Sequence, residues 1–339
     1  MNTNWNFATD REIDVICMGR VAVDLYAEQI GAALEDAETF RKYLGGCAGN
    51  IAVGSSRAGL KSAMFSCVGT DAMGKFLKQE LVRENVDISQ VSETNSHLTG
   101  LVLLGVNPPD RFPLIFYREN CADMQLHKQN VDACFLSLAK ALLITGTGLS
   151  TDSMRSTTHH AVDLARFAGT RIIMDLDYRP VLWKLTAQGD GETRYQSSTL
   201  VSQHYQHMLP KCDLIVGTEE EIQIAGQSDN LAQALTNIRK FTQAPIVCKR
   251  GANGCQIYLH DLNAPISVPS YPTTVLNVLG AGDAFISGFM RGLLRGEDWE
   301  TCARYGNAAG AIVVSRHGCA PAMPTFMEIR SYYERIPAA

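Results

Sequence analysis

Short apolar segments recur along this chain and are separated by stretches with helical character. Most of these segments are bounded by Gly, Asp or Thr, and five of them span residues 62–68, 141–145, 171–175, 213–216 and 245–248. Strands that are apolar along their whole length are buried on both faces. Their alternation with helices therefore predicts an α/β fold with a parallel sheet covered on both sides. A first strand at 14–24 is expected to break at Gly19 and to end on the carboxylate of Asp24.

Two segments, residues 20–44 and 97–118, interrupt this rhythm. They contain runs of strand character, and the turn sequence Asn107-Pro-Pro-Asp110 in the second segment is typical of a hairpin. We expect both segments to form a small β-sheet lid inserted in one α/β domain that spans residues 13–335. Residues 1–12 are expected to be a loose leader.

Composition limits the partners and the compartment. The 339 residues include 30 Lys and Arg against 35 Asp and Glu, so no basic surface for nucleic acid is expected. The ten cysteines contain no Cys-x-x-Cys pair, which predicts reduced core residues rather than a disulfide framework. The polar N-terminus carries no secretory signal, and no apolar run approaches the ~18 residues of a membrane span. We expect a cytoplasmic protein with no membrane partner.

The segment Leu279-Gly-Ala-Gly-Asp-Ala-Phe285, which leads into a helical run, is the strongest candidate for chemistry. Gly280, Ala281 and Gly282 are small enough for the backbone to approach a ligand, and a helix start directs free N–H groups outward. Such an anion-binding turn suits the charge that gathers on a phosphoryl group in transfer. Asp283 could accept a proton from an attacking hydroxyl. Alternatively, it only stabilises the helix N-terminus.

A second glycine-rich segment, Gly45-Gly-Cys-Ala-Gly-Asn50, also precedes a helical run. Its glycines permit a close approach, and Asn50 offers both a donor and an acceptor to hydroxyl groups. On this motif alone, a tight turn with an Asn near the helix start is the simpler interpretation.

Together, Gly45-Gly-x-x-Gly-Asn50 and Gly280-Ala-Gly-Asp283 resemble the two signatures of the PfkB carbohydrate kinases, in the same order and far apart. Three further segments, 68–74, 249–254 and 316–321, resemble other elements of this family. The resemblance extends over roughly residues 13–335. It implies a ribokinase-like fold, in which a doubly wound, mainly parallel α/β core carries a small β-sheet lid.

The resemblance also implies the site residues. MgATP would be the phosphoryl donor and a sugar hydroxyl the acceptor, with Asp283 as catalytic base and the N–H groups of Gly280, Ala281 and Gly282 around the transferring phosphate. The other implied roles are sugar binding by Asp24, Gly46 and Asn50, nucleotide binding by Lys249, Gly251, Gly254 and Asn307, and Mg²⁺ binding through water by Glu220.

Two positions depart from the usual family pattern. Gly217 replaces the asparagine of the Asn-x-x-Glu element, and three adjacent acids at 219–221 leave the choice of Glu220 dependent on the motif alignment. The acidic run also suits the first turn of a helix. Asn277-Val-Leu stands before Gly280 where many members have Asp-Thr-Thr, so the requirement for K⁺ is left open.

Arg118 and Arg179 narrow the substrate class. A guanidinium can hold a carboxylate through two parallel hydrogen bonds. Both segments resemble those of family members that phosphorylate keto-deoxy sugar acids. Without this resemblance, surface or salt-bridged arginines would be the simpler interpretation.

Two motif variants narrow the choice among sugar acids. Val-Leu-Gly-Ala-Gly-Asp and Gly-Thr-Glu-Glu-Glu are most similar to the forms in members that phosphorylate the C6 hydroxyl of 5-dehydro-2-deoxygluconate, in myo-inositol catabolism. Members that act on 2-dehydro-3-deoxygluconate, which usually keep the Thr-Thr form, are the alternative. A non-catalytic sugar-sensing protein of the same fold is a third possibility, although the intact loop and Asp283 argue against it. Family lids often pair, so a homo-oligomer formed through the lid is a further expectation.

Overall fold

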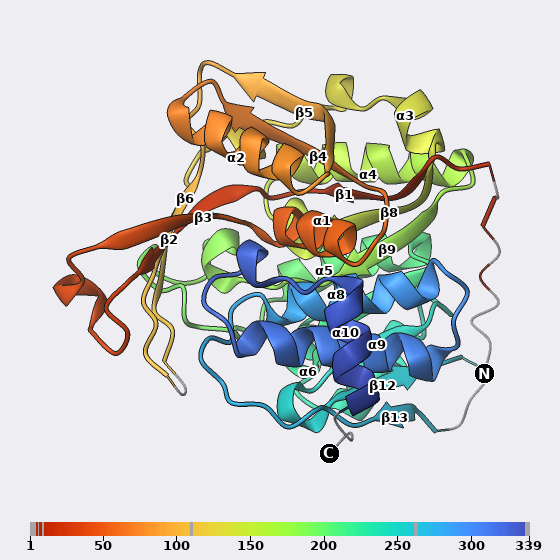
Figure 1. The fold of residues 1–339 in the computed structure, drawn as a ribbon. Coiled ribbons are helices and arrows are strands. Elements are labelled where there is room, and N and C mark those ends of the chain that lie inside the picture. Colours follow the sequence, from red (N-terminus) through yellow and green to blue (C-terminus); the bar gives the residue numbers. More distant parts are fainter. Residues whose placement is uncertain (1–4, 6, 9, 109–110, 261–263, 336–339) are drawn as a thin grey trace.

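The computed structural model describes residues 5, 7–8, 10–108, 111–260 and 264–335 (Figure 1). Its centre is a nine-stranded sheet with the order β13-β12-β11-β10-β9-β8-β1-β4-β5. The strands are β1 (Ile13–Met18), β4 (Ser62–Gly69), β5 (Asp87–Thr94), β8 (Ala139–Thr145), β9 (Arg171–Asp175), β10 (Leu214–Thr218), β11 (Ile246–Lys249), β12 (Cys255–Tyr258) and β13 (Ile266–Val268). Neighbours from β5 to β11 are parallel, and β12 and β13 pair antiparallel. All five apolar segments that the sequence analysis singled out are strands of this sheet.

Helices cover both faces of the large sheet (Figure 1). One face carries α1 (Cys47–Arg57), α2 (Ala72–Arg83), α8 (Ala281–Leu293) and α9 (Trp299–Val314), with α10 (Phe326–Arg335) packed on α9. The other face carries α3 (Ala133–Ser137), α4 (Asp152–Phe167), α5 (Thr199–Met208), α6 (Glu219–Gly226) and α7 (Leu231–Ile238).

The two-sided burial explains the uninterrupted apolar pattern of the strands. In β1, Val15 and Cys17 belong to the hydrophobic cluster on one face, while Ile16 and Met18 belong to the cluster on the other. Successive side chains of a strand point to opposite faces, so a strand between two helix layers needs apolar residues at every position. The predicted α/β fold with a mainly parallel sheet is confirmed.

A smaller four-stranded sheet, which we call the small sheet, projects from the core and lies at the left in Figure 1. Its order is β3-β2-β6-β7, from β3 (Phe40–Gly45), β2 (Ala22–Ala27), β6 (Leu101–Leu104) and β7 (Leu114–Tyr117). The outer pairs are antiparallel, while β2 and β6 are parallel. The expected hairpin between β6 and β7 is present, with a bridge between Asn107 and Arg111. Residues 109–110 of its turn lie outside the described residues.

The expected first strand is divided between the two sheets. β1 ends at Met18, and Gly19 has a φ of 142°. A Cβ at Gly19 would lie 3.2 Å from Thr145 Oγ1, so a glycine suits this break. The break is therefore confirmed, but the expectation that Asp24 ends a core strand was wrong. Asp24 lies inside β2, because the chain leaves the core at Gly19 and enters the small sheet.

The expected leader is described only in part. Residues 1–4, 6 and 9 lie outside the described residues. Trp5 and Phe7 pack against the core, and the guanidinium of Arg171 lies 6.0 Å from the centre of the Trp5 ring. These two side chains therefore contact the folded domain.

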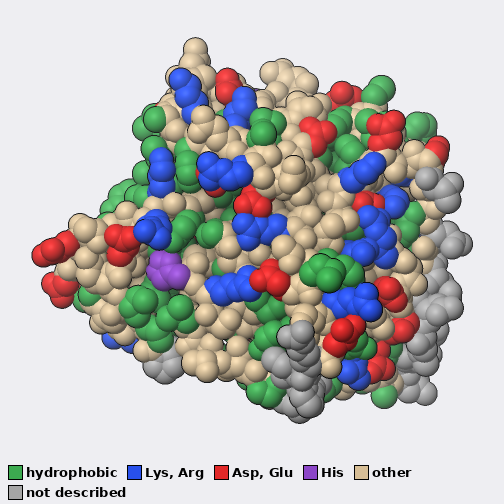
Figure 2. Space-filling model, in the orientation of Figure 1, with side chains coloured by type: hydrophobic (Ala, Val, Ile, Leu, Met, Phe, Trp, Pro, Cys, Tyr) green, Lys and Arg blue, Asp and Glu red, His purple; other side chains and the backbone are tan. Residues whose placement is uncertain are grey.

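The surface and the cysteines match the limits drawn from composition. Figure 2 shows basic and acidic side chains interspersed on one face of the molecule. All ten cysteines are free in the structure, and nine of them are buried, so nearly all lie at the core positions that the sequence predicted. Within the described ranges, no helix combines the length and the apolar character needed to span a bilayer.

The strand order places the candidate site. β1 lies between β4 and β8. From β1, the strands that follow in the sequence are added to the sheet in opposite directions, with β4 and β5 on one side and β8 and β9 on the other. In open parallel sheets, ligands bind outside the carboxyl ends of the strands at such a switch point. The small sheet begins at this edge, because only Gly19, Arg20 and Val21 separate β1 from β2.

Candidate active site

The N-terminus of α8 faces this edge and is built from small residues. Gly280 precedes the helix with a φ of 81°, and a Cβ there would lie 3.0 Å from Cys319 Sγ. A Cβ at Gly282 would lie 3.2 Å from Lys249 Nζ. The amides of Gly282 and Asp283 have no backbone acceptor among the described residues. Free amides at a helix start form a site that can bind an anion.

The two glycine-rich motifs meet at Asp283, in the first turn of α8. Asn50, which α1 positions, donates a hydrogen bond from Nδ2 to Asp283 Oδ2 at 2.8 Å. Gly46 precedes α1 with a φ of 88°, and a Cβ there would lie 2.6 Å from the carbonyl oxygen of Arg20. Burial and the nearby Asp177 carboxylate raise the pKa of Asp283, while the bond from Asn50 opposes the shift. A raised pKa makes a carboxylate a stronger base.

Asp24 lies on β2, close to Asp283. Its side chain is 5 % exposed, and no described residue forms a hydrogen bond or ion pair with its carboxylate. Burial raises the pKa of Asp24 to about 7, and Asp283 adds to the shift while Arg20 opposes it. A Cβ at Gly45 would lie 2.0 Å from this carboxyl group. Gly45 thus leaves room for Asp24, whose oxygens are free to accept hydrogen bonds from a ligand.

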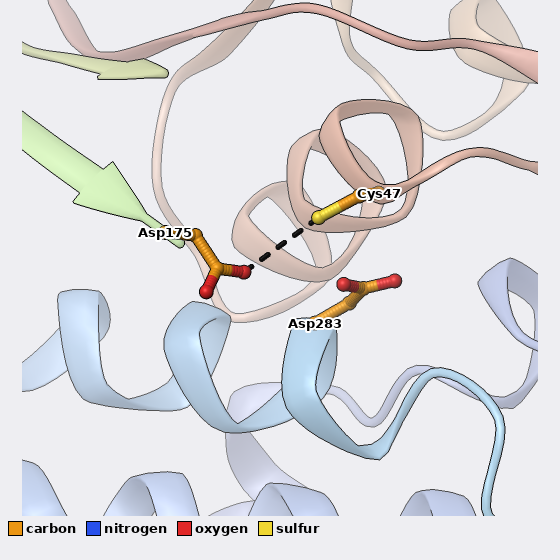
Figure 3. Close-up of side chains that lie close together, drawn as sticks. All are labelled: Cys47, Asp175 and Asp283. Atoms are coloured by element: carbon orange, nitrogen blue, oxygen red, sulfur yellow. Dashed lines mark hydrogen bonds between the residues drawn. The ribbon is translucent and has the colours of Figure 1, made fainter. Parts of the chain in front are cut away.

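A cluster of polar side chains lies beside the start of α8. Figure 3 shows Cys47, Asp175 and Asp283 pointing toward one another from α1, the end of β9 and α8. The Cys47 thiol donates to Asp175 Oδ2 at 3.6 Å, and Lys249 Nζ donates to Asp175 Oδ1 at 3.0 Å. Burial raises the pKa of Asp175 to about 7 although Lys249 lowers it. The nearby carboxylates outweigh burial at Lys249 and raise its pKa, so Lys249 is a charged ammonium next to Gly282.

The ligand atoms of Cys47, Asp175 and Asp283 all lie within 4.8 Å of one another, which is a spacing that could hold a cation. However, the ammonium of Lys249 already compensates Asp175. Burial and three surrounding carboxylates also raise the pKa of the Cys47 thiol well above its usual range, so it stays protonated. A protonated thiol is a poor metal ligand. The cluster suits a phosphate next to Lys249 better than a metal ion.

The two arginines expected to contact the substrate lie in different surroundings. Arg118 forms a buried ion pair with Asp123, with Nε at 2.7 Å and Nη2 at 2.5 Å from Oδ2. Its charge is therefore compensated within the protein. Arg118 also lines an open pocket of about 900 Å³ between β7 and residues 181–188. Arg179 follows β9, donates to the carbonyl of Tyr178 at 2.9 Å and lies 3.8 Å from Asp177.

The residues expected to bind the nucleotide do not form one cluster. Gly251, with a φ of 53°, is exposed, and a Cβ there would meet nothing within 4 Å. A Cβ at Gly254 would lie 2.1 Å from the carbonyl oxygen of Val268. The amide of Asn307 donates to Val268 and Pro269 at 3.2 and 2.9 Å. Gly254 and Asn307 therefore lie against the end of β13. Lys249, the last residue of β11, lies instead beside the start of α8.

The three adjacent acids at the start of α6 differ in their partners. Glu219 pairs with Arg250 at 3.1 Å. Glu221 is buried and accepts hydrogen bonds from the amides of Thr218 and Tyr178. Glu220 is exposed, and its carboxylate has no hydrogen bond or ion pair with any described residue. Of the three, Glu220 is the acid that is free to bind a hydrated cation.

Sequence reasoning assigned no role to four residues that lie in this region: Arg20, Cys47, Asp175 and Asp177. Asp175 ends β9 and Asp177 follows it, and their position at a strand end had marked both as polar groups near a ligand site. Cys47 lies within a recognised motif and was assigned to the core. For Arg20 the only signal is its position directly after the strand break at Gly19.

Comparisons with known proteins agree with this geometry. Residues 12–326 match the profile described as pfkB family carbohydrate kinase. A protein named 5-dehydro-2-deoxygluconokinase from Shouchella clausii is 34% identical over 331 residues, covering 97% of this chain and 98% of the relative. A protein of the same name from Geobacillus kaustophilus is 33% identical over 336 residues, covering 97% of this chain and 96% of the relative.

A solved structure has the same fold. The crystal structure of an Escherichia coli protein assigned as ribokinase II, in complex with ATP and Mg²⁺, superposes with a TM-score of 0.84 at 23% identity. The match covers 95% of this chain and 99% of the other. The large sheet with its helix layers and the small sheet together are therefore ribokinase-like.

Proposed function

Because this chain belongs to the pfkB family of carbohydrate kinases, we propose that it transfers the γ-phosphoryl group of ATP to the C6 hydroxyl of 5-dehydro-2-deoxygluconate. The match over residues 12–326 confirms the family that the sequence motifs indicated. The observation that carries the proposal is the contact of Asp283 with Asn50 at the glycine-built start of α8. This contact combines a base, a hydroxyl-binding amide and an anion-binding helix end.

In the proposed mechanism, the Asp283 carboxylate accepts the proton of the attacking hydroxyl. Its Oδ2 accepts the bond from Asn50, which leaves Oδ1 free for the substrate. The raised pKa of Asp283 favours proton transfer, because the proton affinity of the carboxylate is higher than that of an exposed aspartate. Asp24 accepts a hydrogen bond from the sugar, and Asn50 donates one to it. Gly46 has no side chain, which lets the sugar approach the start of α1.

The residues present fit a nucleotide phosphate. Gly280 and Gly282 leave space that a Cβ would fill, and the free amides of Gly282 and Asp283 and the Lys249 ammonium lie beside it. MgATP supplies the phosphoryl group when bound, and Glu220 would hold Mg²⁺ through water. Lys249 and the amides stabilise the charge that develops on the phosphoryl oxygens. For the remaining nucleotide contacts we propose the exposed turn at Gly251 and the neighbourhood of Gly254 and Asn307.

The substrate assignment rests on the relatives and on the arginines. Both relatives carry the name 5-dehydro-2-deoxygluconokinase at 33–34% identity over nearly the full chain. Arg118 lines the pocket of about 900 Å³, and Arg179 lies beside Asp177 near Asp283. A guanidinium near the base suits a substrate with a hydroxyl at one end and a carboxylate at the other.

Three further features belong to this proposal. Potassium activation is the least supported of them, because Asn277 presents a neutral amide whose Oδ1 already accepts from the Leu279 amide at 3.1 Å. Turnover in potassium salts against sodium salts tests it.

Self-association through the small sheet is supported by exposed Tyr117 at 58 % on its edge strand β7. Light scattering of the purified protein tests it. A cytoplasmic location agrees with ten free cysteines.

The proposal is tested by an ADP-release assay with MgATP and four acceptors: 5-dehydro-2-deoxygluconate, 2-dehydro-3-deoxygluconate, ribose and fructose. We expect the first to have the highest kcat/KM. Preference for the second would keep the mechanism and change the substrate. Turnover of neutral sugars alone would refute the assignment to sugar acids. Binding of a sugar without ADP release would indicate a sensor.

A further inference from the structure

Arg20 is a buried cation that makes no side-chain hydrogen bond to any residue the structure describes. It follows Gly19 at the carboxyl end of β1, and its side chain is only 8 % exposed. A guanidinium carries five N–H donors. None of them donates a hydrogen bond to a described residue, and Nε is enclosed without a partner. Leaving buried donors unpaired costs free energy, so this site requires an acceptor from outside the protein.

Asp177 lies between Arg20 and a second arginine but forms a hydrogen bond with neither. Arg20 Nη2 lies 3.8 Å from Asp177 Oδ2, and Arg179 Nη2 lies 3.8 Å from Asp177 Oδ1. Both distances exceed that of a hydrogen bond. Thr147 Oγ1 donates to Asp177 Oδ2 at 3.1 Å and fixes the carboxylate. Asp177 also has a φ of 29°, and a left-handed conformation at a residue other than glycine is typical of functional sites.

Charged side chains of both signs surround Arg20 and Arg179. The two arginines hold the pKa of Asp177 below its usual range despite burial, so Asp177 is ionised. Glu221 Oε1 lies 4.0 Å from Arg179 Nη1 and is the second carboxylate here. The positive charge of Arg179 lowers the pKa of Arg194 to about 9, and burial adds to the shift. Asp177 and Glu221 lie 3.8 to 4.0 Å from the guanidinium groups of Arg20 and Arg179, beyond hydrogen-bond distance, so donors of both arginines are free for a ligand.

Arg20 also connects the catalytic centre with the open pocket. Its guanidinium carbon lies 5.6 Å from the centre of the Phe116 ring on β7, and Phe116 lines the pocket of about 900 Å³. On the other side, Arg20 lowers the pKa of Asp24, which places its charge next to the sugar-binding carboxylate. Arg118, in contrast, is already compensated by Asp123.

We propose that Arg20 and Arg179 together bind the carboxylate of the sugar acid, and that Asp177 is the residue that positions both guanidinium groups. A carboxylate accepts two parallel hydrogen bonds from one guanidinium, which would satisfy donors that are otherwise unpaired. This inference rests on the proposed sugar-acid kinase function and identifies Arg20 as a determinant of its specificity.

The test compares the acid with a neutral form of the same molecule. The variants R20Q and R20K and the wild-type protein are assayed with MgATP and either 5-dehydro-2-deoxygluconate or its methyl ester. R41Q is the matched control, because Arg41 lies in β3 of the small sheet, is 64 % exposed and forms an ion pair with Glu28 at the surface. Thermal melting of each variant reports its folding.

We expect R20Q to raise KM for the acid about 10- to 100-fold, as the loss of charged hydrogen bonds predicts, with a smaller effect on kcat. The KM for the ester and for ATP should not change, so selectivity for the acid over the ester is lost. R20K should lose part of this selectivity, because an ammonium lacks the planar fork. R41Q should match the wild type.

The outcomes separate the two proposals. A wild-type protein that phosphorylates neither sugar acid refutes the proposed function and with it this inference. A wild-type protein that prefers the acid, with R20Q showing the same KM and the same selectivity, refutes only the role of Arg20. If R20Q does not fold, R20K decides the question, and a selectivity equal to that of the wild type would overturn the inference.

Discussion

Replacing Asp24 by Asn is expected to stabilise the folded protein while it weakens the binding of the sugar. Asp24 is 5 % exposed and has no hydrogen bond or ion pair with a described residue, and burial raises its pKa to about 7 from an ordinary value of 3.8. The folded state therefore holds this carboxyl group at a cost whenever it is ionised. Asparagine has nearly the same shape and carries no charge.

The magnitude follows from the difference in pKa between the folded and the unfolded state. About three pH units at 1.36 kcal/mol each give an upper limit of about 4 kcal/mol. Between pH ~4 and pH ~7 the unfolded chain is ionised at Asp24 while the folded protein is protonated, so the free energy of unfolding of the wild type falls as pH rises. Above pH ~7 the full penalty is present. The advantage of D24N should grow from pH ~4 to pH ~7 and then stay constant.

Urea unfolding of both proteins at several pH values between 4 and 8 measures this difference. The ADP-release assay with the sugar acid gives the functional effect, and we expect KM for the sugar to rise in D24N because an acceptor is lost. The exposed Asp163, which pairs with Lys211 at the surface, provides the control D163N. D163N should show no gain that depends on pH in this way.

A stability difference between D24N and the wild type that is the same at pH 4 and pH 8 would refute this reasoning, because Asp24 would then ionise as an ordinary carboxyl group. An unchanged KM for the sugar would remove Asp24 from the binding site.

Three further substitutions test other parts of the site. D283N should lower kcat by about 10²- to 10⁴-fold with little change in melting temperature. In the wild type, kcat/KM should fall as pH drops through the raised pKa of Asp283. Near-normal turnover by D283N would exclude Asp283 as the base. K249M should lower kcat by about 10²-fold if its ammonium stabilises the phosphoryl group, and a change confined to KM for ATP would contradict this role. R118A should reduce the free energy of unfolding by about 3–5 kcal/mol, since Asp123 is left buried without its partner; urea unfolding measures it, and an unchanged midpoint would show that the pair is not needed for stability.

The fold could be predicted because each core strand is marked by a short, continuous apolar segment of the sequence. Each core strand lies between two helix layers, so the sequence must be apolar at every position of the strand, as in β1 and β9. The break at Gly19 was also visible in the sequence. The sequence also placed residues 20–44 and 97–118 in a small β-sheet, where the structure has β2, β3, β6 and β7. The pairing of these strands was not visible, because nothing local shows that β2 lies parallel to β6, a strand far along the chain.

Part of the site could be predicted for a similar reason. Gly280 and Gly46 occupy backbone conformations with positive φ at helix starts, and such positions favour glycine. The motifs around them therefore predicted two tight turns at helix starts, with Asp283 and Asn50 just inside the helices, and the structure has this arrangement. That these two side chains form a hydrogen bond at 2.8 Å depends on the packing of α1 beside α8.

The sequence by itself determined the layered α/β architecture, the two glycine-rich turns and the candidate base Asp283, because each is encoded by a short pattern of residues. Only the tertiary structure decided which charges are compensated: Arg118 is paired with Asp123, Lys249 with Asp175, and Arg20 has no hydrogen bond to any described residue. The physical reason is that charge compensation depends on distances between strand ends that lie far apart in the chain. The order of the strands and the path of the chain into the small sheet set those distances.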